Sequence, residues 1–398
     1  MEMDLPPGSS LTEEWPLGDD AMMAVVDLQP RTAQSHALLS FFKDYSSEMT
    51  FVRNLDVTGY THFQVFKDGK GKKWLFKPHP LTKEDRALAD EIVDFFAERA
   101  GLASRVPCFA GRLGSRVGVF VEWFDSQGEL SQLIYEYGRE FLQHLTREQL
   151  IQLVQEHVLD AYAANHDAHS RNFLILSDGT LKGIDKSGAY QFVGDPQEDI
   201  SGTYNPNQKA FIVSKAVYEY LFDDLVHDRL AGRLTLAQAQ QEAEKIAAVL
   251  DQISDGEYMD IFNNGYAKLR FDVLKRPTER FIHDEKTFLR FVLQRKHEFR
   301  QKFQEHYRNL KEQLSQFQNR RRAFQRRLIK NLEISTGSPH QQLLQSLSVE
   351  LFSNNADFEK LLDTVESQPQ LFSQIVIDVD SLIRSDRYIG SAWELRDF

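Results

Sequence analysis

The strand and helix patterns of this 398-residue chain are unevenly distributed, and this constrains its fold class most strongly. Four short apolar stretches and one long helical pattern, over residues 82–100, occur between residues 51 and 124. Helical periodicity dominates after residue 129. Strands followed by helices are typical of an α+β fold with a small sheet and a larger helical part. The predicted strands span residues 61–65, 74–76, 106–109 and 117–123, and the predicted later helices span 147–164, 209–253 and 284–330.

Cysteine content and hydropathy exclude several other classes of protein. Cys108 is the single cysteine, so neither an intramolecular disulfide nor a cysteine-based zinc site is available. No apolar run approaches the ~20 residues that a membrane span needs. The acidic start, Met1 to Asp4, lacks the features of a signal peptide. We therefore expect a cytoplasmic protein, and delivery into a host cytosol stays open as an alternative.

The net charge of −12 conceals a strongly basic stretch. Residues 295–330 hold twelve Lys and Arg against three acidic residues. One interpretation is a solvated helix whose charges offset an acidic body. The other is recognition of an anionic membrane or an inositol polyphosphate. Nucleic acid is disfavoured as a partner, because no basic sheet with interleaved aromatic residues accompanies the cluster. The candidate anion-binding residues are Arg320, Arg321, Arg322, Arg326, Arg327 and Lys330.

The strongest candidate for chemistry is a loop between a predicted helix and a predicted strand. It holds Asp167 and, five residues later, Asn172, and Asp185 follows on the next predicted hairpin. An Asp in such a loop can take the proton of an attacking hydroxyl, while Asn and Asp oxygens bind a hard cation such as Mg²⁺. Simple capping of local turns is the alternative interpretation. His166 and His169 are disfavoured as zinc ligands, because only carboxylates accompany them.

A second candidate group precedes that loop in the chain. Lys77 ends an apolar strand and is followed by Pro78, which could place one ammonium in a cleft beside nucleotide phosphates. A carboxylate on the following helix would hold it; Glu91 is the candidate, and Asp90 is the alternative that spacing does not exclude. The turn at Thr58 and Gly59 could lie over phosphates through its N–H groups. A surface lysine at a strand edge is the competing interpretation of Lys77.

The order of these motifs resembles the protein-kinase-like superfamily over about residues 50–315. The run from Asp167 to Asn172 resembles HipA-type kinases, whereas Lys77 with Pro78, and Asp185 after Ile184, resemble phosphatidylinositol 4-kinases. The resemblance implies that Lys77 contacts phosphates and Glu91 orients it, that Asp167 is the catalytic Asp, and that Asn172 and Asp185 bind magnesium. It also implies that a hinge segment contacts adenine through its backbone; the hinge residues would be Glu122, Trp123 and Phe124.

Together these observations predict a bilobal, protein-kinase-like α+β fold with a C-terminal helical extension. The expected parts are an N-terminal arm (1–45), an N-lobe (46–124), a helical C-lobe (125–318), and the basic helix end with a C-terminal helical module (319–398). The expected activity is ATP- and Mg²⁺-dependent phosphotransfer, with Mn²⁺ as a possible substitute, to a protein Ser or Thr hydroxyl. The alternatives are a phosphoinositide acceptor, a small-molecule kinase resembling aminoglycoside phosphotransferases, and a pseudokinase scaffold without catalysis.

Overall fold

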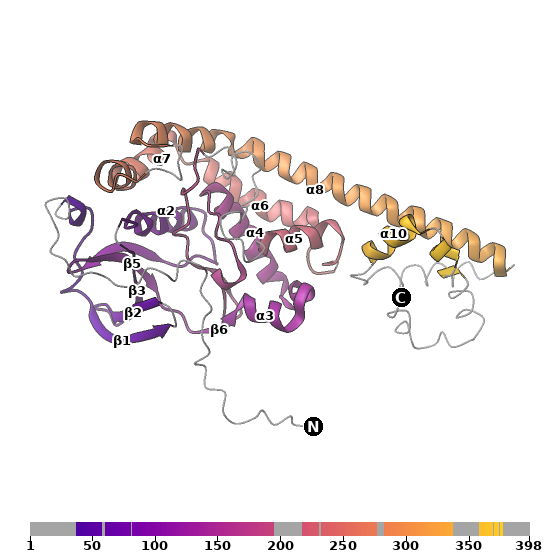
Figure 1. Cartoon of the computed structure of the whole chain (residues 1–398), viewed down its shortest axis with the longest axis horizontal. Coiled ribbons are helices and arrows are strands. Elements are labelled where there is room, and N and C mark those ends of the chain that lie inside the picture. The colour runs from indigo at the N-terminus through magenta and orange to yellow at the C-terminus, as the bar shows by residue number, and fades with distance from the viewer. Residues whose placement is uncertain are drawn as a thin grey trace, which may run out of the picture.

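The structure is a computed structural model that describes most of the chain (Figure 1). The described residues are 37–57, 60–80, 82–194, 217–230, 232–276, 282–336, 358–368, 370–373 and 375–376. Most of the predicted N-terminal arm, residues 1–36, lies outside them, and so do the predicted phosphate-turn residues Thr58 and Gly59.

The early segment forms one antiparallel sheet with the strand order β1-β2-β3-β5-β4. All four predicted strands are present, and β1 is an additional edge strand. The turn between β2 and β3 forms because the Asp68 carboxylate accepts the N–H groups of Lys70 and Lys72 and the indole N–H of Trp74. The strands are β1 (Thr50–Val57), β2 (Tyr60–Lys67), β3 (Lys73–Pro78), β4 (Cys108–Leu113) and β5 (Arg116–Glu122).

One helix, α2 (Asp85–Arg99), lies between this sheet and the helical part of the molecule (Figure 1). Its Ala87 packs with Val117 and Val119 under the sheet, whereas Val93 and Phe96 join the core of the helical part. The predicted helix over residues 82–100 begins only at Asp85, without a side-chain cap, because Thr82 has a φ of 72°, outside the helical range.

Helices dominate the second half of the described chain, with α4 at their centre. The capping box of Thr146 and Gln149 begins α4, and most of its residues from Leu153 onward are buried. The predicted helix over residues 209–253 is two helices, α5 and α6, and residues 209–216 lie outside the described residues. The helices of this part are α3 (Leu130–Tyr137), η2 (Gly138–His144), α4 (Arg147–Tyr162), α5 (Val217–Val226), α6 (Leu236–Asp251), α7 (Asp255–Ile261), η5 (Phe262–Tyr266) and η6 (Leu269–Val273).

A small second sheet, in the order β6-β7-β8, lies against α3 and α4. It contains β6 (Ser126–Glu129), β7 (Phe173–Leu176) and β8 (Leu181–Gly183), and the short helix η3 (Ser170–Asn172) leads directly into β7. The β7–β8 hairpin matches the prediction. Strand β6 was not predicted, because its sequence, Ser-Gln-Gly-Glu, carries no apolar pattern.

A single helix of 52 residues, α8 (Glu285–Thr336), runs from the core of the helical lobe to the C-terminal module (Figure 1). Its first half packs Phe299, Phe303 and Tyr307 into the main core. Its second half packs Phe317, Phe324 and Leu328 against residues of and just beyond α10 (Phe358–Ser367). The predicted boundary at residue 318 therefore falls inside one continuous helix. The C-terminal partners in this second cluster are Leu362, Val365 and Phe372.

The predicted bilobal α+β fold with a helical extension is confirmed: a β-rich lobe with one helix precedes a helical lobe. None of the described helices combines the length and the apolar character that crossing a bilayer requires.

Candidate active site

The structure brings Lys77 and Asp185 together from the two lobes, with 2.5 Å between the ammonium nitrogen and a carboxylate oxygen. Lys77 lies on β3, where neighbouring Phe76 points to the opposite face and is fully buried. Gly118 allows the facing strand to approach, since a Cβ there would lie 2.3 Å from the Lys77 carbonyl oxygen. Burial lowers the pKa of Lys77, but the carboxylates of Asp185 and Asp90 outweigh this effect, so that its pKa is raised.

Asp185 follows β8 with a left-handed backbone, at a φ of 55°. This conformation is uncommon for a residue with a side chain, although Asp tolerates it better than most. The Ser187 hydroxyl donates to its Oδ1 at 2.8 Å. Burial would raise the pKa of Asp185, but the Lys77 charge and the hydrogen bonds from Lys77 and Ser187 hold it well below its ordinary value. Asp185 is therefore an ionised carboxylate at neutral pH.

The predicted loop residues Asp167 and Asn172 are held to one another. The Asn172 amide donates to the Asp167 carbonyl oxygen at 2.8 Å, and the Asp167 N–H donates to the side-chain oxygen of Asn165 at 3.2 Å. Asp167 Oδ1 is buried without a hydrogen-bond partner. Burial and the nearby charge of Asp185 raise the pKa of Asp167 to about 7, although Lys77 opposes this. The loop thus presents a carboxylate that can exchange a proton near neutral pH.

The two histidines of this loop make contacts with neighbouring residues of the protein. The Nδ1 atom of His169 accepts the Arg171 N–H at 3.2 Å, and its Nε2 lies 3.4 Å from Asp167 Oδ1. His166 is buried, and its ring packs edge-on against Phe192 at 5.0 Å. Among the described residues there is no group of three or more His, Cys, Asp or Glu that could hold a metal ion. The bond from Arg171 to His169 indicates that His169 holds the loop.

On α2, Asp90 rather than Glu91 lies on the Lys77 side. Asp90 is 5% exposed, its charge raises the pKa of Lys77, and its Oδ1 accepts the backbone N–H of Lys186 at 2.8 Å. Glu91 instead accepts a hydrogen bond from the backbone N–H of Ala110 on β4. Successive helix residues point about 100° apart, so a shift of one residue changes the face. Burial and Asp185 raise the pKa of Asp90 to about 7.

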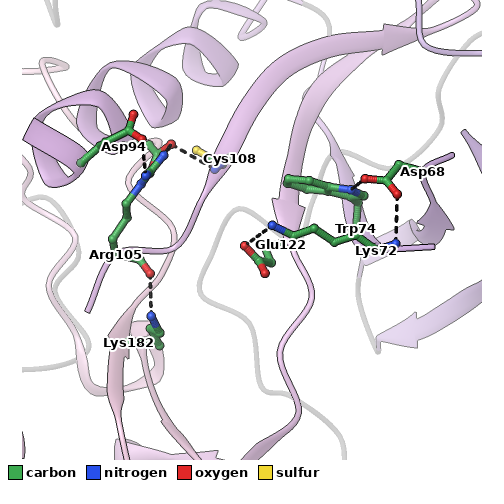
Figure 2. Close-up of polar contacts among 9 residues, drawn as sticks. Asp68, Lys72, Trp74, Asp94, Arg105, Cys108, Glu122 and Lys182 are labelled. Atoms are coloured by element: carbon green, nitrogen blue, oxygen red, sulfur yellow. Dashed lines mark hydrogen bonds and ion pairs between the residues drawn. The ribbon is translucent and has the colours of Figure 1, made fainter. Parts of the chain in front are cut away.

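The predicted hinge, Glu122 to Phe124, joins β5 to β6 between the lobes. The Glu122 N–H donates to Pro107 at 2.9 Å and the Trp123 N–H donates to Lys73 at 3.1 Å. The Glu122 carboxylate pairs with Lys72 at 2.7 Å (Figure 2). Two of the three predicted hinge N–H groups are therefore already used within the protein.

A second polar group joins α2 to the β7–β8 hairpin (Figure 2). Arg105 binds Asp94 through two hydrogen bonds of 2.6 and 2.9 Å, and Asp94 also accepts the Cys108 N–H at 3.2 Å. Lys182 on β8 donates to the carbonyl oxygens of Ala103 and Arg105 at 2.7 and 2.8 Å. A cavity of about 30 Å³ adjoins this group and the Asp185 loop. Burial raises the pKa of Cys108, which does not favour a role as a nucleophile.

The oxygen atoms at this site fit Mg²⁺. Asn172 and Asp185 could supply one amide and one carboxylate oxygen, and Asp167 Oδ1, which makes no hydrogen bond, lies in the same loop as Asn172. Mg²⁺ is usually held by one or two carboxylates together with water and substrate phosphates, rather than by a complete cage of protein ligands. A small set of oxygen ligands is what such a site requires.

Half of the predicted anion-binding residues on α8 already have partners within the chain. Arg320 binds Asp363 at 2.6 Å and Glu366 at 3.1 Å. Arg321 lies 3.9 Å from Asp228, and the Arg327 guanidinium lies 3.9 Å from the ring centre of Phe372. These contacts hold the C-terminal module on α8, and anion recognition by the remaining residues stays a prediction. The remaining exposed members are Arg322, Arg326 and Lys330.

Comparisons with known proteins give weak likenesses. No protein-family model matches the chain, and no curated protein matches it. Among solved structures, the chain is similar to the Helicobacter pylori proinflammatory kinase CtkA, with 10% identity, a TM-score of 0.40, and coverage of 68% of this chain and 99% of that chain. It is also similar to an aminoglycoside phosphotransferase from Alicyclobacillus acidocaldarius, with 15% identity, a TM-score of 0.25, and coverage of 73% and 98%. Both TM-scores are low.

Lys186, Glu156 and Asp160 were not predicted as part of the site. The structure places the Lys186 ammonium 2.7 Å from both carboxylates, in the interior next to Asp185. No signal in the sequence indicated them, because Glu156 and Asp160 lie one turn apart on the side of the helix pattern opposite its apolar residues, where exposure is expected. The structure buries both acids, and no residue pattern identified Lys186 as their partner.

Proposed function

We propose that this protein is a kinase of the protein-kinase-like superfamily, which transfers the γ-phosphoryl group of ATP to a hydroxyl acceptor. The observation that carries the proposal is the contact between Lys77 and Asp185 across the two lobes, beside the loop of Asp167. A phosphate-binding Lys, an ionised metal-binding Asp and a proton-accepting Asp are the groups that phosphoryl transfer uses. The strand order of the sheet, with α2 between β3 and β4, supports the same assignment.

In the proposed reaction the acceptor hydroxyl attacks the γ-phosphorus. The new bond joins the acceptor oxygen to phosphorus, the bond between phosphorus and the β,γ-bridging oxygen breaks, and ADP leaves. The hydroxyl proton passes to Asp167, whose pKa of about 7 suits a base that is ionised and recycled near neutral pH. Lys77 would hold the phosphates, and Asp90 would hold Lys77.

Asn172 and Asp185 would hold Mg²⁺, or Mn²⁺ in its place. The ion would offset charge on the β- and γ-phosphate oxygens. In the structure the Asp185 carboxylate is paired with Lys77, so nucleotide binding would exchange this pair for contacts with phosphate and metal. The Phe124 N–H, which has no hydrogen-bond partner among the described residues, is the hinge donor available to a base.

For the acceptor we propose a protein Ser or Thr hydroxyl, because the run from Asp167 to Asn172 resembles HipA-type kinases. A phosphoinositide hydroxyl is the second candidate. The specific feature that favours it is the exposed basic group on α8, which could face an anionic membrane. That group consists of Arg322, Arg326 and Lys330.

Transfer of label from γ-labelled ATP with Mg²⁺ tests this proposal. The acceptors should be the chain itself, a protein mixture, phosphoinositide vesicles and an aminoglycoside. We expect transfer to protein, a Mg²⁺-dependent rise of Tm with ATP, and loss of transfer by orders of magnitude in Asp185→Ala. Asp272→Ala is the matched control, because Asp272 is exposed and belongs to η6. A wild-type chain with neither transfer nor a shift of Tm would contradict the proposal and favour a pseudokinase scaffold.

A further inference from the structure

A buried ion cluster centred on Lys186 lies next to Asp185, the proposed metal-binding residue. The Lys186 ammonium is 2.7 Å from Glu156 Oε2 and 2.7 Å from Asp160 Oδ1, and it lies 5.8 Å from the centre of the Phe173 ring. The side chains of the two acids are 1% and 0% exposed, and that of Lys186 is 11% exposed. One cation thus serves two carboxylates in the interior. Its pKa is raised, because both carboxylates outweigh the effect of burial.

This cluster is bonded to both loops that carry the proposed chemistry. Asp160 also accepts hydrogen bonds from the Tyr218 hydroxyl at 2.5 Å and from the Asn165 amide at 2.9 Å. Asn165 in turn accepts the N–H of Asp167 at 3.2 Å. A continuous path therefore leads from Lys186, which follows Asp185 in the chain, through Asp160 and Asn165 to Asp167.

The backbone around Asp185 is shaped to admit this cluster. A Cβ at Gly183 would lie 2.1 Å from Glu156 Oε2 and 3.0 Å from the Lys186 ammonium. A Cβ at Gly188 would lie 3.0 Å from the Asn165 side-chain oxygen and 3.2 Å from the Asp167 Cβ. A Cβ at Gly183 would displace the Glu156 carboxylate, and a Cβ at Gly188 would require its neighbours to shift by a few tenths of an ångström. The two glycines that flank Asp185 thus pack against the cluster on one side and against the Asp167 loop on the other.

We propose that Lys186 is a positioning residue that sets the separation of the Asp167 and Asp185 loops, through its ion pairs with Glu156 and Asp160. This inference rests on the proposed function. In that function an acceptor hydroxyl and a metal-bound phosphate must meet between the two loops, so the distance between the loops affects the reaction. Groups that orient metal ligands in this indirect way typically affect metal affinity or activity by about 10–100-fold. A purely structural ion cluster would instead affect stability alone.

The test separates positioning from stability by balancing the charge. Lys186→Met leaves two buried carboxylates without their cation, and we expect a large fall in Tm. Adding Glu156→Gln returns the cluster to its original net charge, and we expect most of the Tm to return. Lys296→Met is the matched control, because Lys296 is also a buried lysine and pairs from α8 with Asp255 of α7 at 2.8 Å.

Two quantities should be measured for each folded variant: phosphate release from ATP, and the ratio of ADP affinities with and without Mg²⁺. For the double variant we expect a kcat about 10–100-fold below wild type and a reduced Mg²⁺ effect on ADP affinity, despite the recovered Tm. Lys296→Met should lose Tm and keep kcat. Recovery of kcat together with Tm in the double variant, or a Lys186→Met protein with wild-type kcat and Mg²⁺ effect, would overturn the inference.

The two proposals fail in different ways. A wild-type chain that neither binds ADP in a Mg²⁺-dependent manner nor releases phosphate contradicts the proposed function, and the role of Lys186 falls with it. A wild-type chain that does both, with a double variant that matches it, contradicts only the role of Lys186.

Discussion

Replacing Lys77 by Met removes the cation that joins the two lobes at the site and keeps most of the volume of the side chain. Asp185 then loses its partner at 2.5 Å, and Asp90 and Asp167 lose the positive charge that opposes the rise of their pKa values. We therefore expect two separable effects of Lys77→Met: a loss of stability from the broken ion pair, and a loss of turnover from the missing phosphate contact.

The exposure of the pair limits the effect on stability. Breaking a fully buried pair costs about 3–5 kcal/mol, because it leaves a buried charge uncompensated. The side chains of Lys77 and Asp185 are 18% and 31% exposed, so we expect a smaller cost, of about 1–3 kcal/mol. The folded chain lowers the pKa of Asp185 from 3.8, so this contribution is present above pH 3.8 and disappears as the pH falls below it. The difference in Tm between wild type and variant should shrink in the same direction.

The effect on turnover should be larger. Loss of one preorganised electrostatic contact to the transition state typically reduces kcat by about 100–1000-fold. Initial rates with labelled ATP, together with Tm values between pH 3 and pH 8, measure both effects on the same protein. Lys73→Met is the control, because Lys73 is an exposed lysine on the same strand. A Lys77→Met chain with wild-type kcat/KM would refute the role assigned to Lys77, even if its Tm were lower.

Three further outcomes follow from the geometry. Asp90→Asn should reduce kcat/KM by about tenfold or more, whereas Glu91→Gln should change it by less than about twofold, because of these two acids Asp90 alone raises the pKa of Lys77. Equal effects in steady-state kinetics would contradict this. The kcat/KM of wild type should fall about tenfold per pH unit below pH 7, since Asp167 must be ionised to accept a proton and its pKa is about 7; a profile flat down to pH 5 would argue against Asp167 as the base. Charge reversal of the exposed basic residues of α8, Arg322, Arg326 and Lys330, should abolish any binding to anionic vesicles and inositol hexakisphosphate. Charge reversal of Arg320 should instead lower Tm, because its contacts with Asp363 and Glu366 are lost. Unchanged vesicle binding would exclude the membrane role.

The elements that could be predicted from the sequence are those whose pattern is local. Lys77 at the end of an apolar strand and the loop from Asp167 to Asn172 both carry their signal within a few residues, and the structure places them as neighbours of Asp185. The β2–β3 turn was predictable for the same reason, since Asp68 binds N–H groups two and four residues ahead.

The parts that could not be predicted depend on how separate helices and strands pack against one another. The choice between Asp90 and Glu91 is decided by which side of α2 faces Lys77, and this follows from how the helix packs between two lobes. The partner of Lys186 comes from α4, about 30 residues away in the chain, so no local pattern could identify it. The boundary near residue 318 stays a prediction: it lies inside α8, whose helical pattern continues without a break where the packing partner changes.

Because α8 is one uninterrupted helix, the number of residues between its two packed segments fixes how the C-terminal module is oriented about the helix axis. The main core ends near Leu310 and the second cluster begins at Phe317, with helical backbone between them. Each inserted residue would turn everything beyond it by about 100° and advance it by about 1.5 Å. One added alanine in this interval would rotate α10 about the α8 axis relative to the helical lobe and separate Arg321 from Asp228, while seven added residues would nearly restore the angle. The number of residues in this interval therefore constrains the sequence, because any change in it alters the direction in which the C-terminal module points.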